Sequence, residues 1–368
     1  MFWTLVVRQW SLQPSERTQK STPKNPEVRN FGVGFQGSVL GKIKTLKGYN
    51  ERMIDAAVHS PYPIEHVQIV DSYEDRYLEE ALDFIQKNAL RCEEIDWKDL
   101  RSKVYLAAKQ GNIHDAIRLA LFLLNDHHSA LFSPQEEAGV LQELQPIEIK
   151  EIVEKSCLLD GNIGYLYVPR FPSGHPKDIS RYASNLQKMI RELEEKGAEQ
   201  WILDLRGNSG GFAMAMMMGL APFFDPSEIL QIWYGARNDW EGLPFDGKTL
   251  RYQEDTYVYS ISLEENPHSL KNPSSKVALL LDGQTGSAGE QTALSFIGSE
   301  NVRSFGEDTG GATTSHLGYV LPDGYTIHLA HFYMNDRQGN IYPSGIPPHE
   351  YTNDPLLAAK LWLQEQNQ

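Results

Sequence analysis

Three separated stretches of the sequence carry side chains that could together hydrolyse an amide bond. The first contains Ser287, which follows the glycine-rich run DGQTG and opens a helical stretch. At such a position free backbone N–H groups and the helix dipole can stabilise the oxyanion that forms when a serine attacks a carbonyl. Ser287 and Glu290 also have the spacing of a capping box, which only starts a helix. The motif alone leaves a structural and a catalytic interpretation open.

The second stretch is the glycine-rich run RGNSGG at residues 206–211, and the third is NDHHS at residues 125–129. A histidine has an ordinary pKa near 6.5, so it can accept a serine proton at neutral pH. A histidine at the end of a helix can equally well complement the helix dipole. Both glycine-rich runs follow short apolar stretches. If those stretches are parallel strands, the two turns meet at one edge of a sheet and face one cleft.

The elements that would position these turns alternate between strands and helices from residue 162 onward. Strands are predicted at 162–171, 200–205 and 277–281, and helices at 178–197, 212–220, 287–296 and 354–366. This alternation predicts an α/β fold with a largely parallel sheet covered by helices. Shorter strands are expected at 302–305, 318–321, 326–332 and 340–342.

The region before the sheet has a different pattern. Residues 71–124 show apolar positions at helical spacing, which predicts three helices joined by short links. Residues 31–47 are expected to form one or two strands, and residues 133–149 a charged connector. We therefore expect a disordered segment at 1–30, a strand-containing start and helical subdomain at 31–134, and a core domain at 135–368.

The composition excludes several classes of protein. The chain has 368 residues, is 40% hydrophobic and carries a formal net charge of −15, which predicts a globular protein that binds no nucleic acid. No apolar run approaches the roughly 18 residues of a membrane helix, so no membrane insertion is expected. Cys92 and Cys157 are far apart and lack metal-site spacing. The N-terminus has no clear signal peptide, which favours the cytoplasm over export but leaves the compartment open.

Four stretches together resemble the tail-specific, or C-terminal processing, serine peptidases, a family related to the tricorn core protease and the interphotoreceptor retinoid-binding protein. They are IDWKDLR with NDHHS, IGYLYVPRF with WILDLRGNSGG, VALLLDGQTGSAGEQTALSF, and RSFGEDTGG with LPDGYTIHL and GIPPHEY. The resemblance implies a ClpP/crotonase-like, mostly parallel sheet core behind a small helical domain. It also implies a peptidase that needs no cofactor or metal and acts on short or unstructured peptides. Tricorn-like relatives assemble, which leaves a homo-oligomer open.

Carried over residue by residue, the resemblance makes Ser287 the nucleophile. It makes the Ala288 N–H, with the N–H of Gly210 or Gly211, the oxyanion hole. The lysine of a Ser-Lys dyad is missing, because FGEDTGGATT stands where such peptidases have a motif like TFGKG. Residues 134–161 also leave too little chain for a PDZ domain. The D-x-H-S/T motif of the tricorn-like branch instead maps His128 to the general base.

The acid that would orient this histidine is not given by any motif. The tricorn-like branch has a glutamate just before a segment that reads IYPSGIPPHE here, where no acid stands at the expected place. Asp336 and Glu290 are the candidate replacements. Asp336 could instead be a turn residue, and Glu290 could simply cap its helix.

The cleft-lining residues predicted for substrate binding are His127, Thr285, Thr313 and His316. Two other functions remain open. One is a non-catalytic protein on the same fold that binds a hydrophobic ligand or a peptide, which the missing glutamate motivates. The other is a crotonase-like acyl-CoA enzyme, which the acidic composition and the SAGE helix start argue against.

Overall fold

The structure is a computed structural model that describes residues 73–364, apart from 127, 144–151, 153, 174–175, 225–227, 235–238, 245, 247, 255–256 and 264–267. It also describes a two-residue strand, β1 (Val28–Arg29). The remaining residues of the predicted disordered segment 1–30, and the strands predicted at 31–47, lie outside the described residues.

A six-stranded sheet with the order β14-β11-β10-β5-β4-β3 forms the centre of the molecule. Neighbouring strands in this sheet are parallel except for the β3–β4 pair. Every residue of β5 and β10 is buried, as expected for a parallel sheet covered on both faces. The predicted α/β fold with a mostly parallel sheet is therefore confirmed. The strands are β3 (Cys157–Leu159), β4 (Ile163–Tyr167), β5 (Gln200–Asp204), β10 (Val277–Leu281), β11 (Val302–Gly306) and β14 (Glu350–Tyr351).

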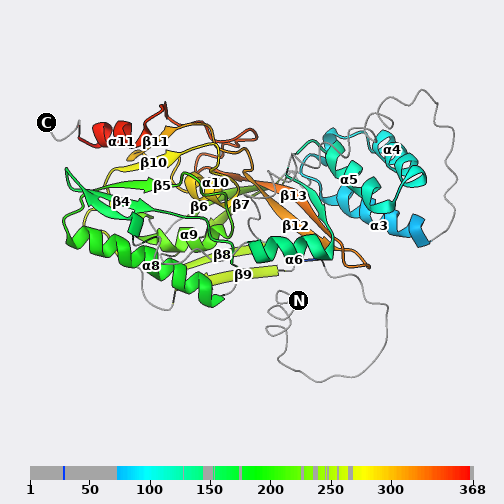
Figure 1. Ribbon diagram of the computed structural model, residues 1–368, viewed down its shortest axis with the longest axis horizontal. Coiled ribbons are helices and arrows are strands. Elements are labelled where there is room, and N and C mark those ends of the chain that lie inside the picture. Colours follow the sequence, from blue (N-terminus) through cyan, green and yellow to red (C-terminus); the bar gives the residue numbers. More distant parts are fainter. Residues whose placement is uncertain are drawn as a thin grey trace, which may run out of the picture.

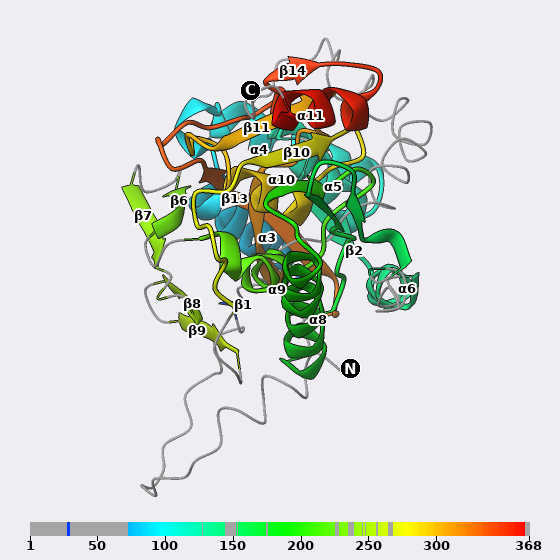
Figure 2. The ribbon, with the colours of Figure 1, turned by 90° about the vertical axis from the view of Figure 1, so that its left-hand side faces the viewer.

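Helices cover both faces of this sheet (Figure 1). On one side α8 (Pro176–Glu195), α9 (Ala213–Gly219) and α10 (Ala288–Leu294) share one apolar cluster with the strands. The methionines of α9 belong to this cluster, so they pack in the core. On the other side α11 (Pro355–Gln364) packs its buried Ala359 and Leu363 against a separate cluster of strand residues. Figure 2 shows α11 above the strands and α8 below them.

A second sheet runs β1-β12-β13-β6-β7, with β2 also paired to β13, and all of these pairs are antiparallel. Its longest strands, β12 (Thr314–Val320) and β13 (Thr326–Asn335), form a hairpin. The strand predicted at 340–342 is wrong, because those residues form no strand, and the connector predicted at 133–149 contains α6 (Pro134–Glu143). The remaining strands are β2 (Ala130–Phe132), β6 (Glu228–Tyr234) and β7 (Asp239–Pro244), beside a separate pair of β8 (Thr249–Glu254) and β9 (Tyr257–Ser262).

The three predicted helices form α3 (Tyr73–Asn88), α4 (Trp97–Gln110) and α5 (Ile113–Leu123), with a short 3-10 helix, η1 (Cys92–Glu94), before α4. They pack on the β12–β13 hairpin and share an apolar cluster with it. The hairpin thus joins the helical unit to the rest of the molecule (Figure 1). Within the described ranges, no helix is long and apolar enough to cross a bilayer.

Candidate active site

Ser287 lies where the chain turns sharply from β10 into α10. Its backbone has φ 50° and ψ −118°, a conformation that non-glycine residues rarely adopt. Hydrolases use a strained strand-to-helix turn of this kind to present a nucleophile. Ser287 and Glu290 stand in the capping-box arrangement, and Glu290 accepts the Ser287 N–H at 2.9 Å. The serine hydroxyl, however, makes no cap hydrogen bond, and it is buried without a partner among the described residues.

Glu290 connects this turn to the loop that follows β11. Besides the Ser287 N–H, its carboxylate accepts the Thr309 hydroxyl and the N–H groups of Gly311 (2.9 Å) and Ala312 (2.8 Å). Burial raises the Glu290 pKa, and these four donors act against that rise. Both carboxylate oxygens are therefore engaged in holding backbone, and no hydrogen bond of the described residues joins Glu290 to a histidine.

Two carboxylates fix the glycine-rich turns at the carboxyl ends of β5 and β10. Asp204 pairs with Arg206 through two hydrogen bonds of 2.9 and 2.7 Å. Asp282 accepts the N–H groups of Gly207 (3.0 Å) and Thr285 (2.9 Å), so it spans both turns. The Thr285 hydroxyl donates to a backbone carbonyl just after β5 at 2.9 Å. Thr285, predicted to bind substrate, is therefore fully buried with its hydroxyl engaged inside the turn.

The turn after β5 lies directly against the serine turn. The Asn208 carbonyl accepts the Gly286 N–H at 3.0 Å. Gly210, with φ 110°, is so close that an added Cβ would lie 2.9 Å from the Ser287 Cβ and 3.1 Å from the Ala288 nitrogen. Only glycine fits this conformation and this gap. The structure therefore brings Gly210, Ser287 and Ala288 together, as the two-turn prediction requires.

Two backbone N–H groups at this junction have no acceptor among the described residues, those of Ala288 and Gly211. The N–H of Gly210, by contrast, donates to the Asn208 side chain at 3.1 Å. Gly211 has φ 121°, and a Cβ there would overlap the Phe171 carbonyl oxygen at 2.0 Å. Of the two glycines that the sequence left as alternatives, Gly211 is the one with an unused donor.

His128 is buried in the loop between α5 and β2. Asp126 fixes this loop by accepting the N–H groups of His128 (2.9 Å) and Ser129 (2.7 Å). The carbonyl of His128 bonds Nε2 of His316 at 2.9 Å, and the two rings lie 3.9 Å apart. Its Nδ1 bonds the hydroxyl of Thr314. Its Nε2 has no partner among the described residues.

The surroundings keep this histidine neutral. Burial lowers the His128 pKa well below its ordinary value, and the neighbouring rings of His316 and His328 lower it further. Burial likewise lowers the His316 pKa to about 3. A neutral imidazole with an unused nitrogen is the state that a general base requires. No hydrogen bond or ion pair of the described residues joins a carboxylate to the His128 ring.

Gln291 links the serine helix to the histidine. It is fully buried one turn after Ser287, and its Nε2 donates to the Thr314 carbonyl at 3.4 Å. The hydroxyl of the same threonine contacts the His128 ring. Thr314 of β12 therefore touches both the serine helix and the His128 ring.

Asp336, the other candidate acid, lies in a turn after β13. Its carboxylate accepts the N–H groups of Gln338 and Asn340, both at 2.9 Å, and the Tyr342 hydroxyl at 2.7 Å. These contacts are those of the turn residue that the sequence left as an alternative. None of them involves His128.

The remaining predicted cleft residues fall in different places. Thr313 is buried, and its hydroxyl donates to a backbone carbonyl at 2.9 Å. His316 is buried, and its ring packs against that of His128. His127 lies outside the described residues. Two further histidines of β13 lie apart in their contacts: His328 Nε2 is 3.7 Å from a Glu137 carboxylate oxygen, and His331 Nδ1 bonds the Asn88 carbonyl at 2.7 Å. In the described part of the chain, no cluster of three or more metal-binding side chains is found.

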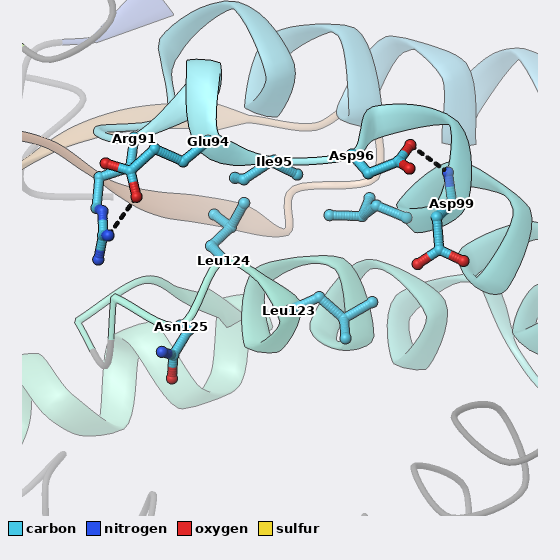
Figure 3. Close-up of a pocket in the computed structure, with 9 residues that line it drawn as sticks. Arg91, Glu94, Ile95, Asp96, Asp99, Leu123, Leu124 and Asn125 are labelled. Carbon is cyan, nitrogen blue, oxygen red and sulfur yellow. Dashed lines mark hydrogen bonds and ion pairs between the residues drawn. The ribbon is translucent and has the colours of Figure 1, made fainter.

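A pocket opens in the helical unit, between the start of α4 and the end of α5 (Figure 3). Its lining is acidic and apolar, but several charges already have partners. Glu94 bonds Arg91, and Asp96 caps the N–H of Asp99 at 3.0 Å. The pocket contains none of the predicted site residues. Its one link to them is Asn125, the first residue of the NDHHS stretch that carries His128. It is lined by Arg91, Glu94, Ile95, Asp96, Asp99, Leu100, Leu123, Leu124 and Asn125.

Sequence reasoning did not single out Asn208, Gln291 or Thr314. Asn208 lies inside the RGNSGG run, so the motif itself marked it. Gln291 follows the serine by one helical turn, which is a weak signal. Thr314 carries no local signal, because its contact with His128 joins positions 186 residues apart.

Comparison with known families places the chain. The model of peptidase family S41 matches residues 162–352, more than half of the 368 residues.

The chain belongs to peptidase family S41.

This S41 protein is thus a hydrolase of the serine-peptidase type, related to the tail-specific proteases as predicted. It is 26% identical over 306 residues to the Nisin-resistance protein of Lactococcus lactis subsp. lactis, and this match covers 82% of the present chain and 90% of that protein. It is 28% identical over 214 residues to the carboxy-terminal processing protease CtpA of Bacillus subtilis (strain 168). That match covers 55% of the present chain but only 39% of CtpA. The structure of a lipoprotein from Streptococcus agalactiae has the same fold, with a TM-score of 0.66 at 23% identity over 82% of this chain and 100% of that one.

Proposed function

We propose that this S41 protein hydrolyses short or unstructured peptides, with Ser287 as the nucleophile and His128 as the general base. The observation that carries the proposal is a pair of buried atoms, Ser287 Oγ and His128 Nε2, that have no partner among the described residues. Leaving one buried polar atom unpaired costs about 1–3 kcal/mol. Two such atoms, on segments linked through Gln291 and Thr314, call for a functional explanation.

In the proposed reaction His128 Nε2 takes the proton from Ser287 Oγ as that oxygen bonds to the carbonyl carbon of the peptide. The negative charge moves to the carbonyl oxygen, which accepts the N–H groups of Ala288 and Gly211. The carbon–nitrogen bond then breaks, and the leaving amine takes the proton from His128. Water attacks the resulting acyl-enzyme by the same route, which releases the acid product and restores Ser287.

The comparisons support short peptides as the substrate class. The likeness to the Nisin-resistance protein extends over 90% of that protein, whereas the likeness to CtpA covers 39% of the processing protease. Residues 134–161 leave too little chain for the PDZ domain that a tail-specific processing enzyme uses. Nisin, which the Lactococcus relative carries in its name, is therefore the first compound to test beside a general peptide library.

The test combines labelling by a fluorophosphonate with hydrolysis of that library and of nisin. We expect the wild-type protein to be labelled and to cleave at least one peptide, and Ser287→Ala to lose both properties. Ser299→Ala, a serine beyond the end of α10, is the matched control and should behave as wild type. A fully active Ser287→Ala protein, or a wild-type protein that is neither labelled nor active, would contradict the proposal.

A further inference from the structure

We propose that Thr314 is the positioning residue of the base, and that its hydroxyl accepts the Nδ1–H of His128 in the place where a Ser-His-Asp triad has a carboxylate. The proposal rests on the function proposed above and adds the third member of the site. Its starting point is the contact between the Thr314 hydroxyl and His128 Nδ1, both of them buried.

Three side chains hold His128, but only one of them reaches a ring nitrogen. Asp126 binds the backbone N–H of the histidine at 2.9 Å, and His316 binds its carbonyl at 2.9 Å. These two contacts fix the loop, but they do not determine which ring nitrogen carries the proton. The contact from Thr314 is to the ring itself. It therefore decides which of the two nitrogens carries the proton.

The direction of this hydrogen bond determines whether the histidine can act as a base. A threonine hydroxyl can donate or accept. When it accepts from Nδ1–H, Nε2 keeps its lone pair, and that nitrogen is the one without a partner among the described residues. If the hydroxyl donated instead, Nε2 would carry the proton and could not take another from Ser287. The proposed reaction therefore requires the accepting arrangement.

The strand β12 presents two side chains to His128. Residues two positions apart on a strand point to the same face of the sheet, and Thr314 and His316 have this spacing. Both contact His128, while the Thr314 carbonyl accepts from Gln291 on the serine helix. The register irregularity in the β12–β13 pairing has its extra residue, His331, on β13, so it leaves this alternation along β12 unchanged.

The candidate carboxylates have other partners. Glu290 accepts hydrogen bonds from the serine turn and from the loop after β11, and Asp336 accepts them from its own turn. A neutral hydroxyl in place of a carboxylate gives the imidazolium no opposite charge, so the base should stay neutral below the ordinary histidine range. The charged or titratable groups that face His128 or its direct neighbours are Asp126 on its own loop, His316 of β12, His328 of β13 and Glu137 of α6, which lies 3.7 Å from His328.

The experiment compares Thr314→Val, which keeps the shape of the side chain, with Thr314→Ser, which keeps the hydroxyl. We expect Thr314→Val to lower kcat by about 10- to 100-fold with KM unchanged, because the base loses its orienting acceptor. Thr314→Ser should recover most of that loss. Thr326→Val is the control, since this buried threonine of β13 bonds Glu137 at 2.8 Å and should leave kcat as in wild type.

A second variant separates positioning from simple packing. Thr314→Asp supplies a carboxylate to Nδ1–H, so it should raise the pKa of His128 and move the acid limb of kcat/KM to higher pH. A purely structural role for Thr314 predicts no such movement. If Thr314→Val does not fold, Thr314→Ala removes the same hydroxyl without adding bulk and is read in the same way.

The proposal is overturned if the hydroxyl-free variants keep wild-type or higher kcat, or if Thr314→Ser is as impaired as Thr314→Val. An unmoved acid limb in a folded Thr314→Asp protein would also overturn it. In each of these cases Ser287→Ala still decides the proposed function independently, because an inactive Ser287→Ala beside an active Thr314→Val removes only the role of Thr314.

Discussion

The two halves of the site are held in different ways. The nucleophile half is local: Ser287, Ala288 and Glu290 lie within four residues of one another, and the turn at 206–211 that meets them is a single run. The base half is assembled from distant parts, since His128 is held by side chains 186 and 188 residues further on. Backbone geometry therefore positions the groups of the nucleophile half, and hydrogen bonds between buried polar side chains position those of the base half.

This difference also sets what each half can tolerate. The nucleophile half concentrates unusual backbone, with positive φ at Ser287, Gly210 and Gly211. It should respond most strongly to an added methyl group. The loop of the base half has one positive φ, at Asn125 (54°), and this half buries several polar rings. It should respond to protonation and to changes in hydrogen bonding.

Among changes that leave Ser287 and His128 in place, the largest effect is expected from Gly210→Ala, which perturbs the nucleophile half alone. The added Cβ would press on the Ser287 Cβ at 2.9 Å and on the Ala288 nitrogen at 3.1 Å. We expect kcat/KM to fall by about 10²–10³-fold, as when one oxyanion donor is displaced. Steady-state kinetics on the best peptide substrate measures this.

The control for that variant is Gly207→Ala in the same turn. Gly207 also has positive φ (71°), but nothing lies within 4 Å of an added Cβ. It should lose about 1 kcal/mol of stability through backbone strain and keep its kcat/KM. Equal kinetic damage in both variants would show that turn strain, and not contact with Ser287, is responsible.

The base half should make the folded state sensitive to mild acid. The folded pKa values of His128 and His316 lie below the unfolded value near 6.5, so the unfolded chain binds more protons as pH falls. Their stabilising contribution is present above pH 6.5 and is lost below it, at about 1.4 kcal/mol per pH unit for each histidine. For His316 the loss continues down to its folded pKa of about 3. Urea unfolding at pH 7.5, 6.0 and 5.0 gives the slope.

The variant His316→Gln isolates one of the two contributions, because it removes a single titrating ring. Below pH 6.5 the slope of the free energy of unfolding against pH should then be smaller by about 1.4 kcal/mol per pH unit, which corresponds to one proton fewer. A slope identical to that of wild type would mean that His316 is not neutral in the folded protein, which contradicts this description of the base half.

The smallest effect is expected far from both halves, at the tip of the β12–β13 hairpin. There Asp323 accepts the Tyr77 hydroxyl at 2.7 Å and bonds His114 at 2.7 Å, which ties the hairpin to α3 and α5. Asp323→Asn should lower the free energy of unfolding by about 0.5–1.5 kcal/mol. Because the tip does not touch the site, kcat/KM should change less than about twofold. A tenfold loss of kcat/KM would show that the helical unit controls the base.

The sequence predicted the local elements of this arrangement better than the other strands. The strand at Val277–Leu281, the glycine-rich turns and the serine helix were all predicted from local pattern, because buried runs and turn residues identify themselves. The antiparallel strands β6 to β9 were not predicted, and residues 340–342 form no strand but bond the Asp336 carboxylate through Asn340 and Tyr342. The missed pairs, β6 with β7 and β8 with β9, join consecutive strands, so distant partners do not explain the miss. Strand propensity depends on packing context, which the local pattern does not contain.

The site was predictable to the same extent. Motif resemblance pointed to Ser287, Ala288 and His128, but the candidate orienting groups in the sequence were both carboxylates, Glu290 and Asp336. The group that reaches the His128 ring is the Thr314 hydroxyl, in a stretch with no motif of its own. Long-range side-chain contacts of this kind become visible only in three dimensions.

A double-mutant cycle of Ser287→Ala and His128→Ala tests the central proposal most directly. If the two residues form one catalytic unit, each single change should lower kcat by about 10⁴-fold or more. The kcat of the double variant should then be no lower than that of the less active single variant. Effects that simply multiply would contradict the proposal, as would a His128→Ala protein that keeps wild-type kcat.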